Sequence, residues 1–198
     1  VITLTQQNEG VVYDATVDPY ECMLNPPLIA DVDEGQPIEL FGVDYRGGYD
    51  QDSWPENGPF GPSSGLWGSR YIFNAGFRDG VLSDVCNQIR EEWTPTPFAV
   101  SVPEGVAVGE VIPLDTVHTF TINVDDEDIQ GYLLDGLERG EVEFGVSTMY
   151  RVESQTGTFA SFYMKENALV EFGLVSPATL ELTLEEDLGG DPCDFDGD

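Results

Sequence analysis

DDEDIQGYLLDGLERG (residues 125–140) is followed by three shorter stretches, and together they decide the fold: EVEFGV (141–146), TFASFYMKE (158–166) and ATLELTLE (178–185). In the first stretch Ile129, Leu133 and Leu137 recur every four residues, and acidic residues crowd the start. Gly140 follows Arg139 at the end. Early carboxylates, a late cation and a glycine just past it suit the helix dipole and the unpaired carbonyls. This stretch is predicted to be a helix.

The three shorter stretches carry a strand pattern. Val142, Phe144 and Val146 alternate with polar or small residues, and the last stretch alternates in the same way through Ala178, Leu180, Leu182 and Leu184. A period of two means that one face is buried and the other is in water. The sequence therefore predicts half-buried antiparallel strands capped by one helix.

The rest of the chain adds further short elements. Strands are expected at 1–6, 11–17, 37–43, 70–76, 98–102 and 117–124, the last with Phe120, Ile122 and Val124 facing inward. A second helix is predicted at 79–93, where Val81, Val85, Ile89 and Trp93 recur every four residues before TPTP. This pattern favours an all-β fold, an antiparallel β-sandwich of jelly-roll type with one or two short helices. A mixed α+β fold is the alternative. We expect one domain over 1–184 and an acidic tail over 185–198.

The charge balance limits the partners. Among 198 residues, 7 are Lys or Arg and 38 are Asp or Glu, so the formal net charge is −31. Such a surface repels phosphate backbones and anionic lipids, which argues against nucleic-acid and membrane-surface roles. No run of 18 apolar residues is present, so no membrane insertion is expected. Cations, above all Ca²⁺, are the natural small partners; a merely solubilising acidic surface is the alternative reading.

Cysteine usage bears on the compartment. A chain that starts at Val1 in mid-strand, with three cysteines and few lysines, is typical of an exported protein, secreted or held at the cell surface. Cys22 and Cys86 are candidates for a disulfide, which leaves Cys193 for a partner elsewhere. Three free thiols in a reducing cell are the alternative.

Two segments are candidate ligand sites. Asp194, Asp196 and Asp198 occupy positions one, three and five of a calcium loop of EF-hand type, although an acidic tail explains them equally well. The stretches 31–35 and 124–131 are alternative cation sites. In the long loop 44–69, Tyr45, Tyr49, Trp54 and Trp67 are candidates for a sugar-stacking platform, or else for an interface between subunits.

Catalytic signals are weak. The single histidine, His118, shares its strand phase with Phe120 and Ile122 and is therefore expected in the core. The letters G-x-S-x-G occur at 61–65 (GPSSG), but they lie in the long Gly- and Pro-rich loop and not between a strand and a helix, so no nucleophile elbow is present. There is also no cluster of His and Cys with zinc-ligand spacing. A glycan-active enzyme would use a pair of carboxylates. Among so many acidic residues, the sequence alone does not indicate which two would form such a pair.

The segment from His118 to Leu184 resembles the C-terminal half of a group of secreted proteins of uncharacterised function from planctomycete-like bacteria. The resemblance lies in FTINVDDEDIQGYL, GLERGEVEFGVSTM, FASFYMKEN and TLELTLE, and DPCDFDGD looks like their dockerin-type calcium segment. It implies export and a β-sandwich, and it supplies no catalytic residues.

These observations favour a non-enzymatic structural or assembly subunit with associated calcium. Val1, Ile2 and Leu4 are the candidate assembly strand, which either joins the chain's own sheet or pairs with a neighbouring molecule. A carbohydrate-binding module that uses the 44–69 aromatics is the alternative, and a glycan-active enzyme is the third possibility.

Overall fold

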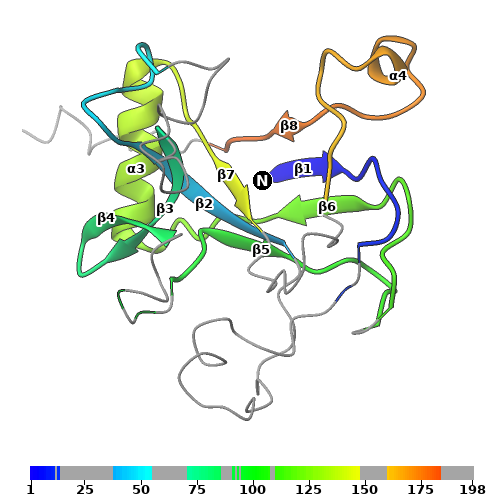
Figure 1. Cartoon of the computed structure of the whole chain (residues 1–198), viewed down its shortest axis with the longest axis horizontal. Coiled ribbons are helices and arrows are strands. Elements are labelled where there is room, and N and C mark those ends of the chain that lie inside the picture. Colours follow the sequence, from blue (N-terminus) through cyan, green and yellow to red (C-terminus); the bar gives the residue numbers. More distant parts are fainter. Residues whose placement is uncertain are drawn as a thin grey trace, which may run out of the picture.

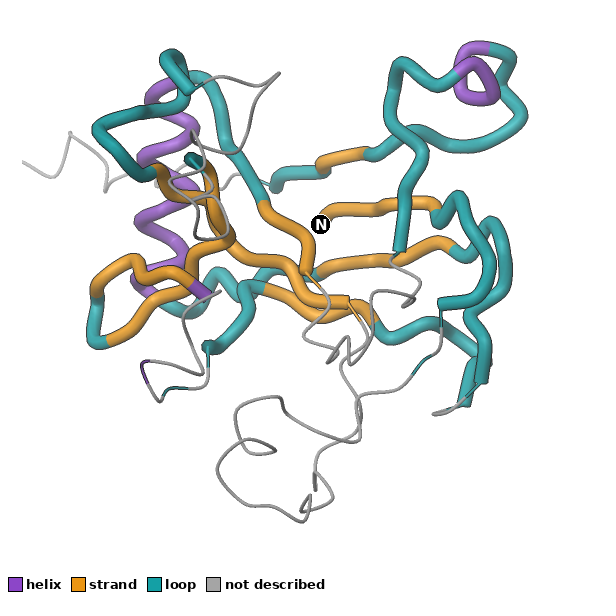
Figure 2. Tube along the Cα trace, viewed as in Figure 1, coloured by secondary structure: helices purple, strands orange, loops and turns teal. Residues whose placement is uncertain are grey.

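The fold is all-β and sandwich-like, as the sequence predicts, and its described residues form two antiparallel sheets and the short helices α3 and α4 (Figure 1). The computed structural model describes residues 1–11, 13, 38–54, 71–85, 91, 93, 95–107, 110–147 and 160–183. Its strands are β1 (Ile2–Thr5), β2 (Ile38–Tyr45), β3 (Ile72–Arg78), β4 (Val81–Asp84), β5 (Ala99–Ser101), β6 (Val117–Phe120), β7 (Gly145–Ser147) and β8 (Thr179–Leu180). The helices are α3 (Glu127–Arg139) and α4 (Ala168–Glu171). Figure 2 shows long loops between these short strands.

The smaller sheet has the order β6-β1-β8. Ile2 pairs with Phe120 on one side and with Leu180 on the other, and Glu181 donates its N–H to the Val1 carbonyl at 2.8 Å. The predicted N-terminal strand is confirmed. Both of its hydrogen-bonding edges are occupied by strands of the same chain.

The larger sheet has the order β4-β3-β2-β5, and β7 also pairs with β2. Its central strand β2 is buried on both faces. Ile38 and Leu40 contribute to the main core, and Phe41 joins Val85 and Trp93 in a separate cluster. This continuous burial explains why β2 reads as an apolar run and not as a strict alternation.

One core joins the two sheets to α3. Ile2, Leu40 and Phe120 from the sheets pack with Ile129 and Leu133 from the helix. Burial of each such side chain stabilises the fold by about 1.5–3 kcal/mol. The core therefore fixes where α3 lies on the sheet.

Helix α3 begins and ends as the sequence predicts. The Asp126 carboxylate accepts hydrogen bonds from the N–H groups of Asp128 and Ile129, at 3.0 and 3.2 Å. Gly140 ends the helix with φ 86°, a conformation that glycine adopts without a Cβ clash. Leu137, expected to face inward, is 37% exposed.

The predicted helix at 79–93 is wrong over its first part. Residues 81–84 form β4, which pairs with β3 through a hairpin. Asp79 and Gly80 form the turn with φ 51° and 74°, and an Asp-Gly pair between two strands is the usual signal for such a turn. Residues 86–90, 92 and 94 lie outside the described part.

Three strand phases also differ from the prediction. Val146 is 37% exposed, because the buried position next to it is Gly145, which lies against the Asn74 side chain where no Cβ would fit. Val124 is 52% exposed and lies beyond the end of β6 at Phe120. In the last strand only Thr179 and Leu180 pair, and Leu180 is 45% exposed. The predicted half-buried final strand is thus an exposed edge among the described strands. Of the predicted strand at 158–166, the described residues form one bridge, Gln6 to Phe162.

Candidate functional site

A groove of about 920 Å³ lies between α3 and the end of β2 with the turn that follows it. The helix presents this face because Ile129 and Leu133, on the other side, are held in the core. Of the eighteen described residues that line the groove, eight are acidic: Asp44, Asp50, Asp52, Glu127, Asp128, Asp135, Glu141 and Glu143. We call this feature the acidic groove.

Tyr132 forms part of the groove and joins the helix to the sheet. Its hydroxyl accepts the N–H of Val43 at 2.9 Å and donates to the carbonyl of Glu143 at 2.7 Å. Its ring packs edge-on against Phe98, with 5.3 Å between centroids. Burial is the main cause that raises the pKa of Tyr132, so the hydroxyl stays protonated and able to donate.

Tyr45 lies at the end of β2. Its hydroxyl donates to the Glu143 carboxylate, and its ring is tilted against Trp54 with 6.4 Å between centroids. Burial, followed by this hydrogen bond to a carboxylate, raises the pKa of Tyr45. The Tyr45 ring is therefore fixed beside the groove, and its hydroxyl proton is already donated to Glu143.

The turn after β2 supplies the other aromatic wall. Gly47 and Gly48 turn the chain at φ 73° and 78°, and the Tyr49 ring then packs on Tyr71 with 4.5 Å between centroids. The Asp50 carboxylate accepts hydrogen bonds from the Ser53 hydroxyl and the Asp52 N–H. The Ser53 hydrogen bond is the main cause that lowers the pKa of Asp50.

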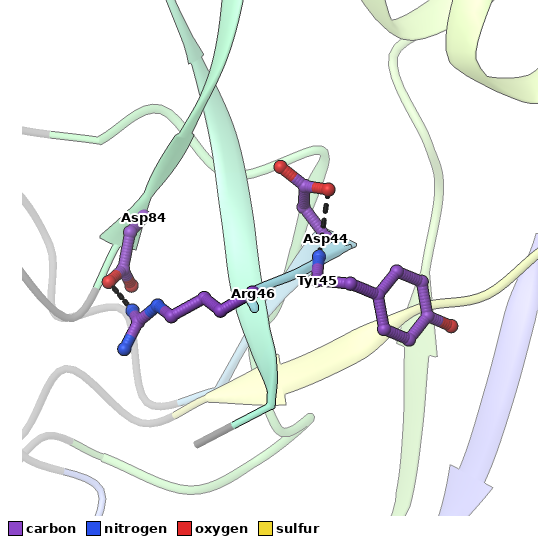
Figure 3. Close-up of polar contacts among 4 residues, drawn as sticks. All are labelled: Asp44, Tyr45, Arg46 and Asp84. Carbon is purple, nitrogen blue, oxygen red and sulfur yellow. Dashed lines mark hydrogen bonds and ion pairs between the residues drawn. The ribbon is translucent and has the colours of Figure 1, made fainter. Parts of the chain in front are cut away.

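The cation nearest in sequence to these residues is turned away from the groove. Figure 3 shows Arg46 reaching Asp84 on β4 while the Tyr45 ring points to the opposite side. The Arg46 guanidinium also lies over the Phe73 ring, 4.4 Å from its centroid. Among the described residues that line the groove, Arg139 is the single basic one.

The structure thus locates part of the predicted aromatic platform. Tyr45 and Tyr49 line the groove, Trp54 lies against Tyr45, and Trp67 is outside the described residues. The helix residues Tyr132 and Asp135 were not among the predicted site residues. Their signal was the spacing of Asp128, Tyr132, Asp135 and Arg139, which places polar side chains along one helix face.

The predicted calcium and disulfide residues are not described. Asp194, Asp196, Asp198, Cys22, Cys86 and Cys193 all lie in undescribed segments, as does the stretch 31–35. In the stretch 124–131, Asp126 caps α3. Over the described ranges, no group of three or more His, Cys, Asp or Glu side chains is arranged to hold a metal ion. Calcium binding stays a prediction. None of the helices in the described part has the length and apolar character needed to cross a membrane.

His118 lies in the core, as expected. It is fully buried and is hydrogen-bonded to the Ser101 hydroxyl at 3.2 Å and to the Gln6 side-chain oxygen at 3.1 Å. Burial lowers the pKa of His118 to about 4. Ser101 and Gln6 are no more than 1% exposed, so a substrate has no route to this Ser–His pair as it stands.

A second surface lies at the opposite end of the molecule from α3, around α4 and β8 (Figure 1). It carries large exposed apolar side chains: Met164, Leu169, Phe172, Leu174, Leu180 and Leu182. Phe172 and Leu174 are 77% and 70% exposed. Between Asn167 and Leu180 the single charged residue is Glu171. We call these residues the apolar edge, because β8 ends its sheet among the described strands.

Comparison with known proteins found no family model, no curated protein and no solved structure that matches this chain.

Proposed function

We propose that this protein is a non-enzymatic structural or assembly subunit, extracellular or at the cell surface, that associates with further copies of itself through the apolar edge. The observation that supports this most directly is the exposure of Phe172 and Leu174 after α4 and of Leu180 in β8, a strand with one free side in the described sheet. Large exposed apolar side chains and an unpaired strand edge are both typical of interaction surfaces.

Charge favours a second copy at this place. Two molecules that each carry −31 repel one another over most of their surfaces. The segment from Asn167 to Leu180 has one charge, so it is a region where two copies approach with little repulsion and bury apolar area. Antiparallel pairing of two β8 strands about a two-fold axis would continue the sheet from one copy to the next.

The strand proposed here to mediate assembly is β8, and not the N-terminal strand that the sequence suggested. Val1, Ile2 and Leu4 belong to a segment whose strand pairs on both sides, and Ile2 and Leu4 are buried in the core. Deletion of residues 1–6 would therefore remove the centre of the smaller sheet. Such a variant would lose its fold together with any assembly, so it cannot distinguish the two effects.

The test is the mass of the native particle, measured by light scattering and sedimentation across a concentration series. The double variant Phe172→Glu/Leu180→Glu should remain folded and become monomeric. The control Val81→Glu/Val102→Glu adds the same charge at positions that are 64% and 60% exposed and lie outside the apolar edge, and it should assemble as the unchanged chain does. A monomeric unchanged chain, or equal disruption by both variants, would overturn the proposal. Repeating the series with calcium and with chelator tests the calcium association that the sequence suggests.

The acidic groove favours a second candidate function, carbohydrate binding. Tyr45, Tyr49 and Tyr132 place rings beside carboxylates that accept hydrogen bonds, and sugars offer both apolar C–H faces and hydroxyl donors. The test is retention on immobilised polysaccharides. Tyr49→Ala should abolish retention while leaving the particle mass unchanged, because the substitution lies outside the apolar edge.

A further inference from the structure

We propose that Tyr49 and Tyr71 form an oxidative modification site, at which a carbon–carbon bond between the two rings produces dityrosine. The link would join residues 49 and 71 of the same chain and so close the segment 50–70 covalently. It depends neither on assembly through the apolar edge nor on sugar binding.

The backbone brings the two tyrosines to the same place. Tyr45, at the end of β2, pairs with Ile72, the residue that follows Tyr71. One residue further along, Arg46 donates its N–H to the Tyr71 carbonyl at 2.7 Å. The turn after β2 then returns the chain, so that Tyr49 lies beside Tyr71. Both side chains are therefore positioned by a hydrogen-bonded strand end.

The two rings are in contact at their hydroxyl ends. Their centroids are 4.5 Å apart with an interplanar angle of 57°, at the short end of the range of about 4.5–7 Å for aromatic pairs. Burial is the main cause that raises the pKa of Tyr71, and the charge of the Tyr49 hydroxyl and a hydrogen bond to it follow. The carbons that couple in dityrosine flank the carbon that bears the hydroxyl. Contact at the hydroxyl ends therefore brings carbons that can couple close to each other.

The pair is also accessible to an oxidant. Tyr49 is 36% exposed and Tyr71 is half-buried. Each of the other tyrosines in the described part of the chain is either buried or packed against a ring of another kind: Tyr13, Tyr45, Tyr132 and Tyr163. Among the described tyrosines, Tyr49 and Tyr71 thus combine exposure with a tyrosine neighbour.

The oxidant is hydrogen peroxide, used by a haem peroxidase. Each hydroxyl loses one hydrogen atom, as an electron and a proton, and both rings become phenoxyl radicals. The radicals join through one carbon beside each hydroxyl, and the hydrogens on these two carbons move to the oxygens, which restores both phenols. The peroxide accepts the two electrons and two protons and is reduced to two water molecules.

The experiment is oxidation of the full chain at low concentration with a haem peroxidase and hydrogen peroxide, followed by digestion with trypsin. Trypsin cuts after Arg46, Arg70 and Arg78, so Tyr49 and Tyr71 are each the single tyrosine of their peptides, 47–70 and 71–78. We expect a linked pair of these peptides whose mass is their sum less two hydrogens. Because the rings are in contact before the reaction, coupling within one chain should exceed coupling between chains by about tenfold or more. The oxidised protein should therefore run as a single chain on a denaturing gel.

Matched variants identify the residues that couple. Tyr49→Phe and Tyr71→Phe each keep a ring in place and remove the hydroxyl that is oxidised, so dityrosine fluorescence should fall by about tenfold or more. Tyr45→Phe removes a hydroxyl that is not in the pair and should leave the fluorescence unchanged.

Three results would overturn the proposed site. They are an unchanged chain that forms no dityrosine, linked peptides that contain other tyrosines in place of 47–70 and 71–78, and equal loss of fluorescence in all three variants. The first would show that the two rings only pack together, and the other two would show that oxidation does not select this pair.

Discussion

The Tyr132 hydroxyl on α3 accepts the backbone N–H of Val43 on β2 at 2.9 Å. The same hydroxyl donates to the Glu143 carbonyl at 2.7 Å, so one side chain ties the helix, the central strand and the segment leading into β7 together. Val43 is 8% exposed, and water therefore has little access to its N–H. The wall of the acidic groove and the junction between helix and sheet depend on the same residue.

Tyr132→Phe should destabilise the fold by about 1–3 kcal/mol, because it leaves the Val43 N–H and the Glu143 carbonyl without their partner while the ring stays in place. The measurement is the free energy of unfolding in urea. Val102→Ala, at a side chain that is 60% exposed, should change stability by less than about 0.5 kcal/mol. Equal stability of the Tyr132→Phe variant and the unchanged chain would mean that this hydrogen bond contributes nothing net.

Two glycines in α3 should respond to substitution by alanine with opposite changes in stability. A Cβ on Gly131 would meet nothing within 4 Å, so Gly131→Ala should stabilise the fold by about 0.5–1 kcal/mol through helix propensity. A Cβ on Gly136 would lie 2.9 Å from the Glu141 carbonyl oxygen and 2.8 Å from Val142 Cγ2, so Gly136→Ala should destabilise it by about 1–3 kcal/mol through overpacking. Thermal unfolding of both variants checks the prediction, which fails if the two substitutions shift the midpoint in the same direction.

Local signals were sufficient for most elements. The Asp126 cap and Gly140 define α3 from neighbouring residues alone, and that prediction is confirmed. The helix expected at 79–93 is wrong at β4 because the four-residue spacing of Val81 and Val85 outweighed the Asp79-Gly80 turn signal. A periodic apolar pattern over few residues fits a helix and a short strand alike, so the turn residues had to decide between them.

Features that depend on distant residues were harder to predict. The acidic groove brings Tyr45 and Asp50 beside Asp135 and Glu143, which lie far along the chain, and no local spacing links them. Leu180 likewise is exposed in β8, which ends its sheet among the described strands, whereas alternation alone predicts one buried face. Periodicity indicates that one face of a strand is apolar, but not that this face meets a core within the same molecule.

Salt should stabilise this protein. At a net charge of −31 the folded state is under self-repulsion, which counterions screen over about 10 Å at 0.1 M. The midpoint of thermal unfolding should rise as NaCl increases from 10 mM to 0.5 M. CaCl₂ at matched ionic strength separates screening from binding, because a larger rise with calcium indicates specific sites and an equal rise indicates screening alone. A midpoint that does not respond to either salt contradicts the prediction.

Acid should destabilise the fold through His118, the single histidine of the chain. Burial lowers its pKa from 6.5 to about 4, so the unfolded chain binds a proton more readily than the folded one as the pH falls. The stability contributed by the neutral imidazole is therefore complete above about pH 6.5 and is lost progressively towards pH 4. Between pH 7.5 and pH 5 the loss should be about 2 kcal/mol.

The carboxylates titrate in part of the same range, so the comparison uses His118→Gln, whose amide keeps hydrogen-bonding capacity towards Ser101 and Gln6 but does not titrate. The variant will be less stable at every pH, and the informative quantity is the slope of its unfolding free energy against pH. That slope should be shallower than in the unchanged chain between pH 7.5 and pH 5, with the difference amounting to about 2 kcal/mol. Parallel slopes would show that His118 takes up its proton in the folded state as readily as in the unfolded chain. In that case the Ser101–His118–Gln6 network opens to water below neutral pH, and its burial does not hold the imidazole neutral.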